Sequence, residues 1–249
     1  PHPQISRGRP VPSVDFLGNV SGLLTKLLLW NWKMENHHIS VHTESMLVDY
    51  IDSNATVTDG TQFRLNEYKP LGDLARLVKN RKVSWLFRLF PGLPQTLLYE
   101  VLLPGRVFGG LVAGDHYNPW TDTVHLYSDV PAVALHEAGH AHDIGTRRFK
   151  GWYSLAYNLV PFVNLSQENQ ATTDALRHLI ETRQYDEEVA AYKILYPAYG
   201  SYLGSYAIVP GGRLVAVFTG AFVGHIVGRS QARRRARYYQ MIKSASPAP

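Results

Sequence analysis

The chain has 249 residues, enough for one large domain or for one domain with an appendage. Hydrophobic residues make up 45% and charged residues 18%, which is typical of a folded globular protein and excludes a largely disordered chain. There is no cysteine, so disulfides and thiolate metal sites are excluded. Any transition metal must therefore be bound by histidine, aspartate or glutamate.

The formal net charge of +5 is concentrated near the C-terminus. Five arginines lie within 229–237, and the remaining 20 basic residues balance the 20 acidic residues. A basic run can bind nucleic acid, but this one directly follows an apolar segment and therefore fits anionic lipid headgroups better. We expect a membrane partner and no nucleic acid.

The sequence of the N-terminal region predicts an extended arm followed by two helices. Residues 1–13 are rich in proline and fit an extended arm. From Val14 to about Glu35, apolar residues recur at helical spacing. Two tryptophans near the end of this helix fit either a membrane interface or packing on the core, and both alternatives stay open. Residues 40–51 predict the second helix.

The middle of the chain alternates between short elements. Residues 61–70 predict a strand and 71–80 a short helix. Residues 84–113 are strongly apolar, but three prolines interrupt them, so we expect broken helical pieces and no continuous transmembrane helix. The predicted strand 123–127 then leads into a helix with Pro131 in its first turn.

The C-terminal part predicts a helical hairpin. Residues 196–209 and 214–228 form two apolar helices that are separated by a turn at 210–212. In the second helix glycine recurs at every fourth position, a pattern that lets helices approach closely. Each helix is short for a bilayer, so membrane insertion, full or partial, and packing within a soluble fold both stay open. Residues 196–237 are the expected contact with membrane lipid or with a membrane protein.

These elements predict an α+β fold that is rich in helix. We expect an extended arm at 1–13, a main domain at 14–195, the apolar glycine-rich hairpin at 196–228 and a basic tail at 229–249. The sequence has no GxSxG motif and no glycine-rich phosphate loop between a strand and a helix. Serine hydrolase chemistry and nucleotide binding are therefore not indicated.

Three residues of the helix that begins near Pro131 form a metal-binding pattern. His136 and His140 lie one turn apart, so both imidazoles can point at one ion. Glu137 is rotated by about 100° around the helix axis, where a carboxylate can accept a proton from a metal-bound water. The spacing is that of the HExxH motif and predicts a Zn²⁺ site with Glu137 as general base.

Two histidines need a third protein ligand to complete such a site. Glu168 is the favoured candidate, because its segment predicts a second helix that can return to the first. Thr172 lies one turn further on the same face, where its hydroxyl could orient the carboxylate, and Asp174 is close enough for an outer contact. Asp143 is the alternative third ligand. It lies on the face of both histidines, and we expect it to orient an imidazole by a hydrogen bond.

With these residues identified, the sequence resembles the zincin metallopeptidases, and specifically the gluzincin arrangement, whose third zinc ligand is a glutamate on a following helix. The sequence departs from the usual pattern at Thr172, where those enzymes have aspartate. The stretch Phe63 to Gly204 also resembles an uncharacterised group of bacterial predicted metallopeptidases. The resemblance implies a zincin-like core with a small rim sheet, an active-site helix and a ligand helix. It also implies a peptide or protein substrate.

The sequence does not single out a donor for the oxyanion that peptide hydrolysis would form. Histidines and tyrosines near the motif are the candidates, and each is individually more often structural than catalytic. They are Tyr117, His125, His178, Tyr127 and Tyr199.

Three functions are consistent with these patterns. The first is a membrane-associated zinc metallopeptidase in a bacterial membrane or the mitochondrial inner membrane. The second is a non-catalytic subunit of a membrane complex that keeps the zincin fold and retains the zinc. The third is a zinc hydrolase that cleaves a bond other than a peptide bond. The complete set of ligands and base favours the first.

Overall fold

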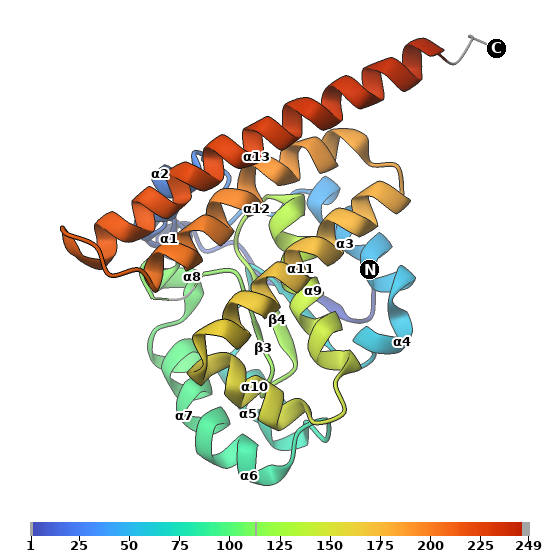
Figure 1. The fold of residues 1–249 in the computed structure, drawn as a ribbon. Coiled ribbons are helices and arrows are strands. Elements are labelled where there is room, and N and C mark those ends of the chain that lie inside the picture. Colours follow the sequence, from blue (N-terminus) through green and yellow to red (C-terminus); the bar gives the residue numbers. More distant parts are fainter. Residues whose placement is uncertain (1, 113, 246–249) are drawn as a thin grey trace.

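The computed structural model describes residues 2–112 and 114–245, and within them the chain forms an α+β fold rich in helix (Figure 1). The described strands form one four-stranded sheet in the order β1-β2-β4-β3. The β1–β2 and β2–β4 pairs are parallel, and β3 pairs with β4 in the antiparallel sense. The strands are β1 (Ile5–Arg7), β2 (Gln62–Leu65), β3 (His116–Asn118) and β4 (Thr123–Leu126).

The two faces of this sheet differ in polarity because side chains alternate along a strand. Phe63, Leu65, Val124 and Leu126 are fully buried and form the main core together with α3 and α9. The opposite face carries Arg64 and His125, which are also buried. The sheet is therefore covered on both faces, by an apolar layer on one and a polar layer on the other.

The N-terminal half consists of short helices, and the bounds differ from the predicted ones. The predicted arm contributes strand β1, and the predicted helix from Val14 is divided at Gly22 and ends at Trp30 in a left-handed conformation. The prolines of 84–113 break that stretch into short pieces, as predicted. The elements are α1 (Pro12–Ser21), α2 (Leu23–Leu29), α3 (Val41–Ser53), α4 (Ala55–Thr58), α5 (Pro70–Lys79), α6 (Trp85–Phe87), the π-helix η1 (Arg88–Gly92), α7 (Leu93–Thr96), the π-helix η2 (Leu97–Leu102) and α8 (Gly105–Phe108).

The C-terminal half consists of longer helices. The helices α9 and α11 cross against each other next to the sheet, and α12 and α13 lie side by side along one flank of the molecule (Figure 1). The elements are α9 (Pro131–Thr146), α10 (Lys150–Leu159), α11 (Pro161–Glu181), α12 (Tyr185–Ser205) and α13 (Gly212–Ala245).

The predicted hairpin is present, but its helices are longer than expected. The first begins at Tyr185, and the second continues through the predicted basic tail as far as Ala245. The glycines bring the two backbones together, since a Cβ added to Gly200 would lie 2.2 Å from the carbonyl oxygen of Gly220. Across the described residues, none of the helices has the length and apolar character needed to traverse a bilayer.

Candidate metal centre

The three motif residues lie on α9, which directly follows the sheet. His136, Glu137 and His140 have exposed fractions of 9%, 8% and 6%. The helix is buried on nearly all sides because the sheet, α3 and α11 pack around it. The Nε2 atoms of His136 and His140 lie 3.1 Å apart, so the two imidazoles converge as the helical spacing predicts.

Glu168 reaches the same point from α11. Its Oε2 lies 3.1 Å from Nε2 of His136 and 3.5 Å from Nε2 of His140. The two helices approach closely at Gly139, where an added Cβ would lie 3.0 Å from the carbonyl oxygen of Ala171. A larger residue between the two histidines would separate the helices and move Glu168 away from the imidazoles.

The geometry of these three atoms fits a metal ion. A tetrahedral site with bonds of about 2.0–2.1 Å places neighbouring ligand atoms about 3.3 Å apart. The observed separations among His136, His140 and Glu168 are 3.1, 3.1 and 3.5 Å. Burial raises the pKa of Glu168, but the imidazoles of His140 and His136 outweigh it and hold this pKa below its usual value. The donor set is therefore one that binds Zn²⁺ in proteins.

Two further side chains contact the proposed ligands. The hydroxyl of Tyr157 on α10 donates to Oε1 of Glu168 at 3.0 Å. Thr172 contacts Nδ1 of His136 at 3.3 Å, so it orients an imidazole and not the carboxylate that we expected. Nδ1 of His140 has no hydrogen-bond partner among the described residues.

Asp143 does not orient either imidazole. It accepts hydrogen bonds from Tyr153, at 2.7 Å, and from Gln167, at 3.3 Å, and it pairs with Arg147. It thus joins α9 to α10 and α11 beside the centre. The prediction that Asp143 contacts a ligand histidine has no counterpart in the structure.

Asp174 lies outside the centre. It accepts a hydrogen bond from Tyr50 and pairs with Nδ1 of His142 at 3.2 Å and with Arg177 at 3.5 Å. These partners lie on the side of α9 and α11 that faces away from His136 and His140. Asp174 therefore stabilises helix packing and makes no contact with the proposed ligands.

Glu137 lines two adjacent cavities, which together we call the cleft. One has a volume of about 270 Å³ and is lined by His136, Glu137 and Tyr202 among others. The other has a volume of about 60 Å³ and is lined by Glu137, His140, Glu168 and Tyr202. Burial and the neighbouring carboxylate of Glu168 raise the pKa of Glu137 to about 7, although His136 opposes the shift.

The predicted oxyanion donors are scattered. Tyr117 lines the smaller cavity, but its hydroxyl donates to Asp122 at 2.9 Å. His125 lies on the polar face of the sheet, and His178 packs against the ring of Tyr50 with centroids 5.1 Å apart. Tyr127 is buried and Tyr199 half-buried, and neither lines the cleft. The structure brings only Tyr117 of this group to the cleft.

Sequence reasoning missed two tyrosines at the centre. Tyr157 contacts Glu168, and Tyr202 on α12 lines both cavities. The carboxylates of Glu168 and Glu137 raise the pKa of Tyr202 above its usual value. The sequence signal for Tyr202 is weak, because it is one of several tyrosines in the hairpin.

Comparison of the chain with protein-family models, with curated proteins and with solved structures finds no significant match. The functional interpretation of this centre therefore depends on its own geometry and on the motif of α9.

Proposed function

We propose that the protein is a zinc-dependent metallopeptidase with a zincin-like core that works at a membrane surface. The convergence of His136, His140 and Glu168 at ligand distances, with Glu137 beside them in a cleft, carries this proposal. These three residues would hold Zn²⁺, and Glu137 would act as general base. The bound ion supplies polarisation of the scissile carbonyl and a lowered pKa for a bound water.

The side chains around the cleft have separate roles in this proposal. Glu137 accepts the proton of the attacking water and passes it to the leaving amine. Tyr202 is the donor assigned to the oxyanion, because this residue lines both cavities. Tyr157 and Thr172 hold Glu168 and His136 in their orientations through the contacts described above.

An edge strand beside the cleft favours a peptide over other hydrolysable substrates. Strand β3 is the last strand of the sheet, and its residues His116 and Tyr117 line the smaller cavity. An extended peptide can add to such an edge by backbone hydrogen bonds. In this arrangement its scissile carbonyl lies between Glu137 and Tyr202.

The membrane part of the proposal is supported by an exposed apolar surface. Side chains of α2 and α13 border one common cavity, which includes Leu27, Trp30, Phe218 and Phe222. We call the exposed side chains around it the apolar face, and the five arginines at 229–237 follow it on the same helix. Apolar side chains next to basic ones suit an anionic lipid surface. The apolar face consists of Leu27, Trp30, Phe218 and Phe222.

The substitution Glu137→Gln tests the proposed activity. It removes the base but leaves both imidazoles and Glu168, so bound zinc should remain at the wild-type level. Cleavage of an unfolded protein such as casein should fall by about 100-fold or more. Glu181→Gln, at the exposed end of α11, is the matched control and should cleave normally.

Two experimental outcomes would contradict this proposal. Undiminished cleavage by Glu137→Gln would contradict the assignment of the base. A zinc-loaded wild-type protein that cleaves no peptide would favour the non-catalytic subunit or a hydrolase of other bonds, and the apolar face would then serve as a contact with a membrane protein.

A further inference from the structure

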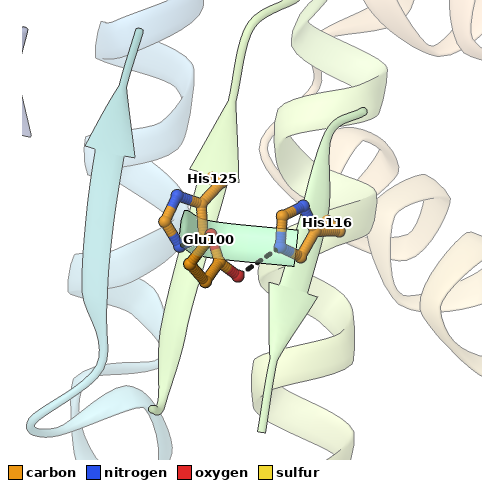
Figure 2. Close-up of side chains that lie close together, drawn as sticks. All are labelled: Glu100, His116 and His125. Atoms are coloured by element: carbon orange, nitrogen blue, oxygen red, sulfur yellow. Dashed lines mark hydrogen bonds and ion pairs between the residues drawn. The ribbon is translucent and has the colours of Figure 1, made fainter. Parts of the chain in front are cut away.

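A second group of potential ligands lies on the polar face of the sheet. His116 of β3 and His125 of β4 are paired directly across the antiparallel register, so both side chains project from the same face. Their rings are stacked, with centroids 4.9 Å apart and an interplanar angle of 10°. Figure 2 shows both imidazoles turned towards the carboxylate of Glu100, which comes from the π-helix η2.

The three side chains place their ligand atoms close together. Oε1 of Glu100 lies 2.8 Å from Nε2 of His116, and Oε2 lies 3.3 Å from Nε2 of His125. One nitrogen or oxygen atom from each residue lies within 4.8 Å of the others. These separations resemble those among the residues of the α9 centre.

Unsatisfied polar atoms point into this group. His125 is only 2% exposed, and neither of its ring nitrogens has a hydrogen-bond partner among the described residues. Asp73 of α5 is 1% exposed, and its Oδ1 is also without a partner and lies 3.7 Å from Nε2 of His125. Leaving such buried atoms unpaired is unfavourable, and a cation between them would satisfy both.

The charge of Glu100 also requires a partner. Glu100 is 2% exposed, and within the described chain no lysine or arginine lies within ion-pair distance of it. Its contacts are the two imidazoles and the amide of Asn118, which donates at 3.1 Å. A buried carboxylate needs a compensating positive charge. Here that charge comes either from a protonated His116, whose pKa Glu100 raises to about 9 against the effect of burial, or from a metal ion in place of the proton.

The orientation of His116 suits a metal ligand. Its Nδ1 lies 2.8 Å from the carbonyl oxygen of Gly114, which can only accept a hydrogen bond. The carbonyl therefore holds one proton on Nδ1. Nε2 lies 2.8 Å from Oε1 of Glu100, so in the absence of an ion it donates a second proton to that carboxylate, and a bound ion would take the place of this proton. Histidine ligands are commonly oriented by such a bond to a backbone carbonyl.

We propose that Glu100, His116 and His125 bind a second divalent transition-metal ion, with Asp73 as a fourth ligand. Imidazole and carboxylate donors together suit Zn²⁺. The ion would join η2 to β3 and β4. Because His116 also lines the smaller cavity beside Glu137, the ion would fix that wall of the cleft. This site is independent of the α9 centre and does not require the proposed activity.

Metal counting on the full chain tests this proposal. The protein is stripped with a chelator, loaded with Zn²⁺, dialysed, and its zinc content is measured by mass spectrometry. The wild type should bind two ions per chain. His125→Asn and Glu100→Gln should each bind one, His140→Asn should also bind one, and the double variant His125→Asn/His140→Asn should bind none. His38→Asn, at an exposed histidine, is the matched control and should bind two.

The outcomes separate the two metal sites. A single ion that is lost in His140→Asn and kept in His125→Asn and Glu100→Gln would overturn the second site and leave the proposed function standing. A single ion with the reverse behaviour would support the second site and contradict the α9 centre. Should the variants fail to fold, anomalous diffraction from zinc-loaded wild-type crystals decides, since a peak at bonding distance from Nε2 of His116 supports the site and its absence overturns it.

Discussion

At the scale of single residues, the proposed centre depends on tyrosine hydroxyls from helices that flank α9. Removing the hydroxyl of Tyr157 in Tyr157→Phe leaves Oε1 of Glu168 without its donor. We expect zinc affinity to fall by about tenfold, because contacts that orient a ligand have effects of that size. Competition with a fluorescent chelator measures the change. Tyr153→Phe, on the same helix but bound to Asp143, should keep wild-type affinity, and equal losses in the two variants would contradict the role of Tyr157.

A second prediction for a single residue concerns Tyr202, whose substitution should change turnover and not zinc binding. Tyr202→Phe removes a donor that is proposed to act on the oxyanion and not on zinc. We expect kcat to fall by about 100-fold while zinc content and KM stay close to those of the wild type. Steady-state kinetics with a single peptide substrate make the distinction. Tyr199→Phe, one turn away on α12, should have normal kcat, and an unchanged kcat in Tyr202→Phe would assign the oxyanion to another group.

The sequence allowed only part of this centre to be predicted at the residue level. His136, Glu137 and His140 were accessible because their relative positions follow from the period of one helix. The partners of Asp143 and Asp174 depend on how α9 packs against α11. A local sequence pattern carries no information about that packing. Tyr157 was missed for the same reason, since its contact with Glu168 requires α10 to fold back along the centre.

At the scale of elements, the hairpin depends on glycines at the contact between α12 and α13. A Cβ added to Gly220 would lie 2.1 Å from the carbonyl oxygen of Gly200. We expect Gly220→Ala to lower the free energy of unfolding by about 1–3 kcal/mol, because the two helices must separate. Ser230→Ala, at an exposed position of the same helix, is the control. Alanine favours helix at both positions, so a stabilised Gly220→Ala would show that the close contact is absent.

Elements were predictable where the pattern is local. The prolines in 84–113 are compatible only with short pieces, and the glycine spacing indicated the hairpin. The helical conformation of 229–245 could not be foreseen, because a run of arginines is also typical of a solvated tail. It depends on a tertiary contact in which Arg235 donates to the buried Glu188 of α12 at 2.6 Å.

At the scale of the whole molecule, the apolar face predicts binding to anionic lipid. Phe222, which belongs to this face, is 55% exposed, and Phe222→Asp adds a charge where we expect contact with acyl chains. Binding to phosphatidylcholine vesicles that contain phosphatidylglycerol should fall by about tenfold or more, as measured by co-sedimentation. Leu71→Asp, at an exposed position of α5, should bind as the wild type does. If the two variants bind these vesicles equally well, the apolar face does not contact lipid. If only Phe222→Asp loses self-association, the apolar face is instead a contact with a second copy of the chain.

The glycine contact between α12 and α13 has a mechanical consequence. Because the two backbones touch at the glycines, no layer of side chains lies there to absorb a displacement, and we expect the pair to move as one rigid rod. The rod carries Phe222 on its outer side and Tyr202 at the mouth of the cleft. Under the proposed function, a displacement of the outer side of this pair would therefore reach the cleft, so that binding to a membrane would be coupled to peptide cleavage.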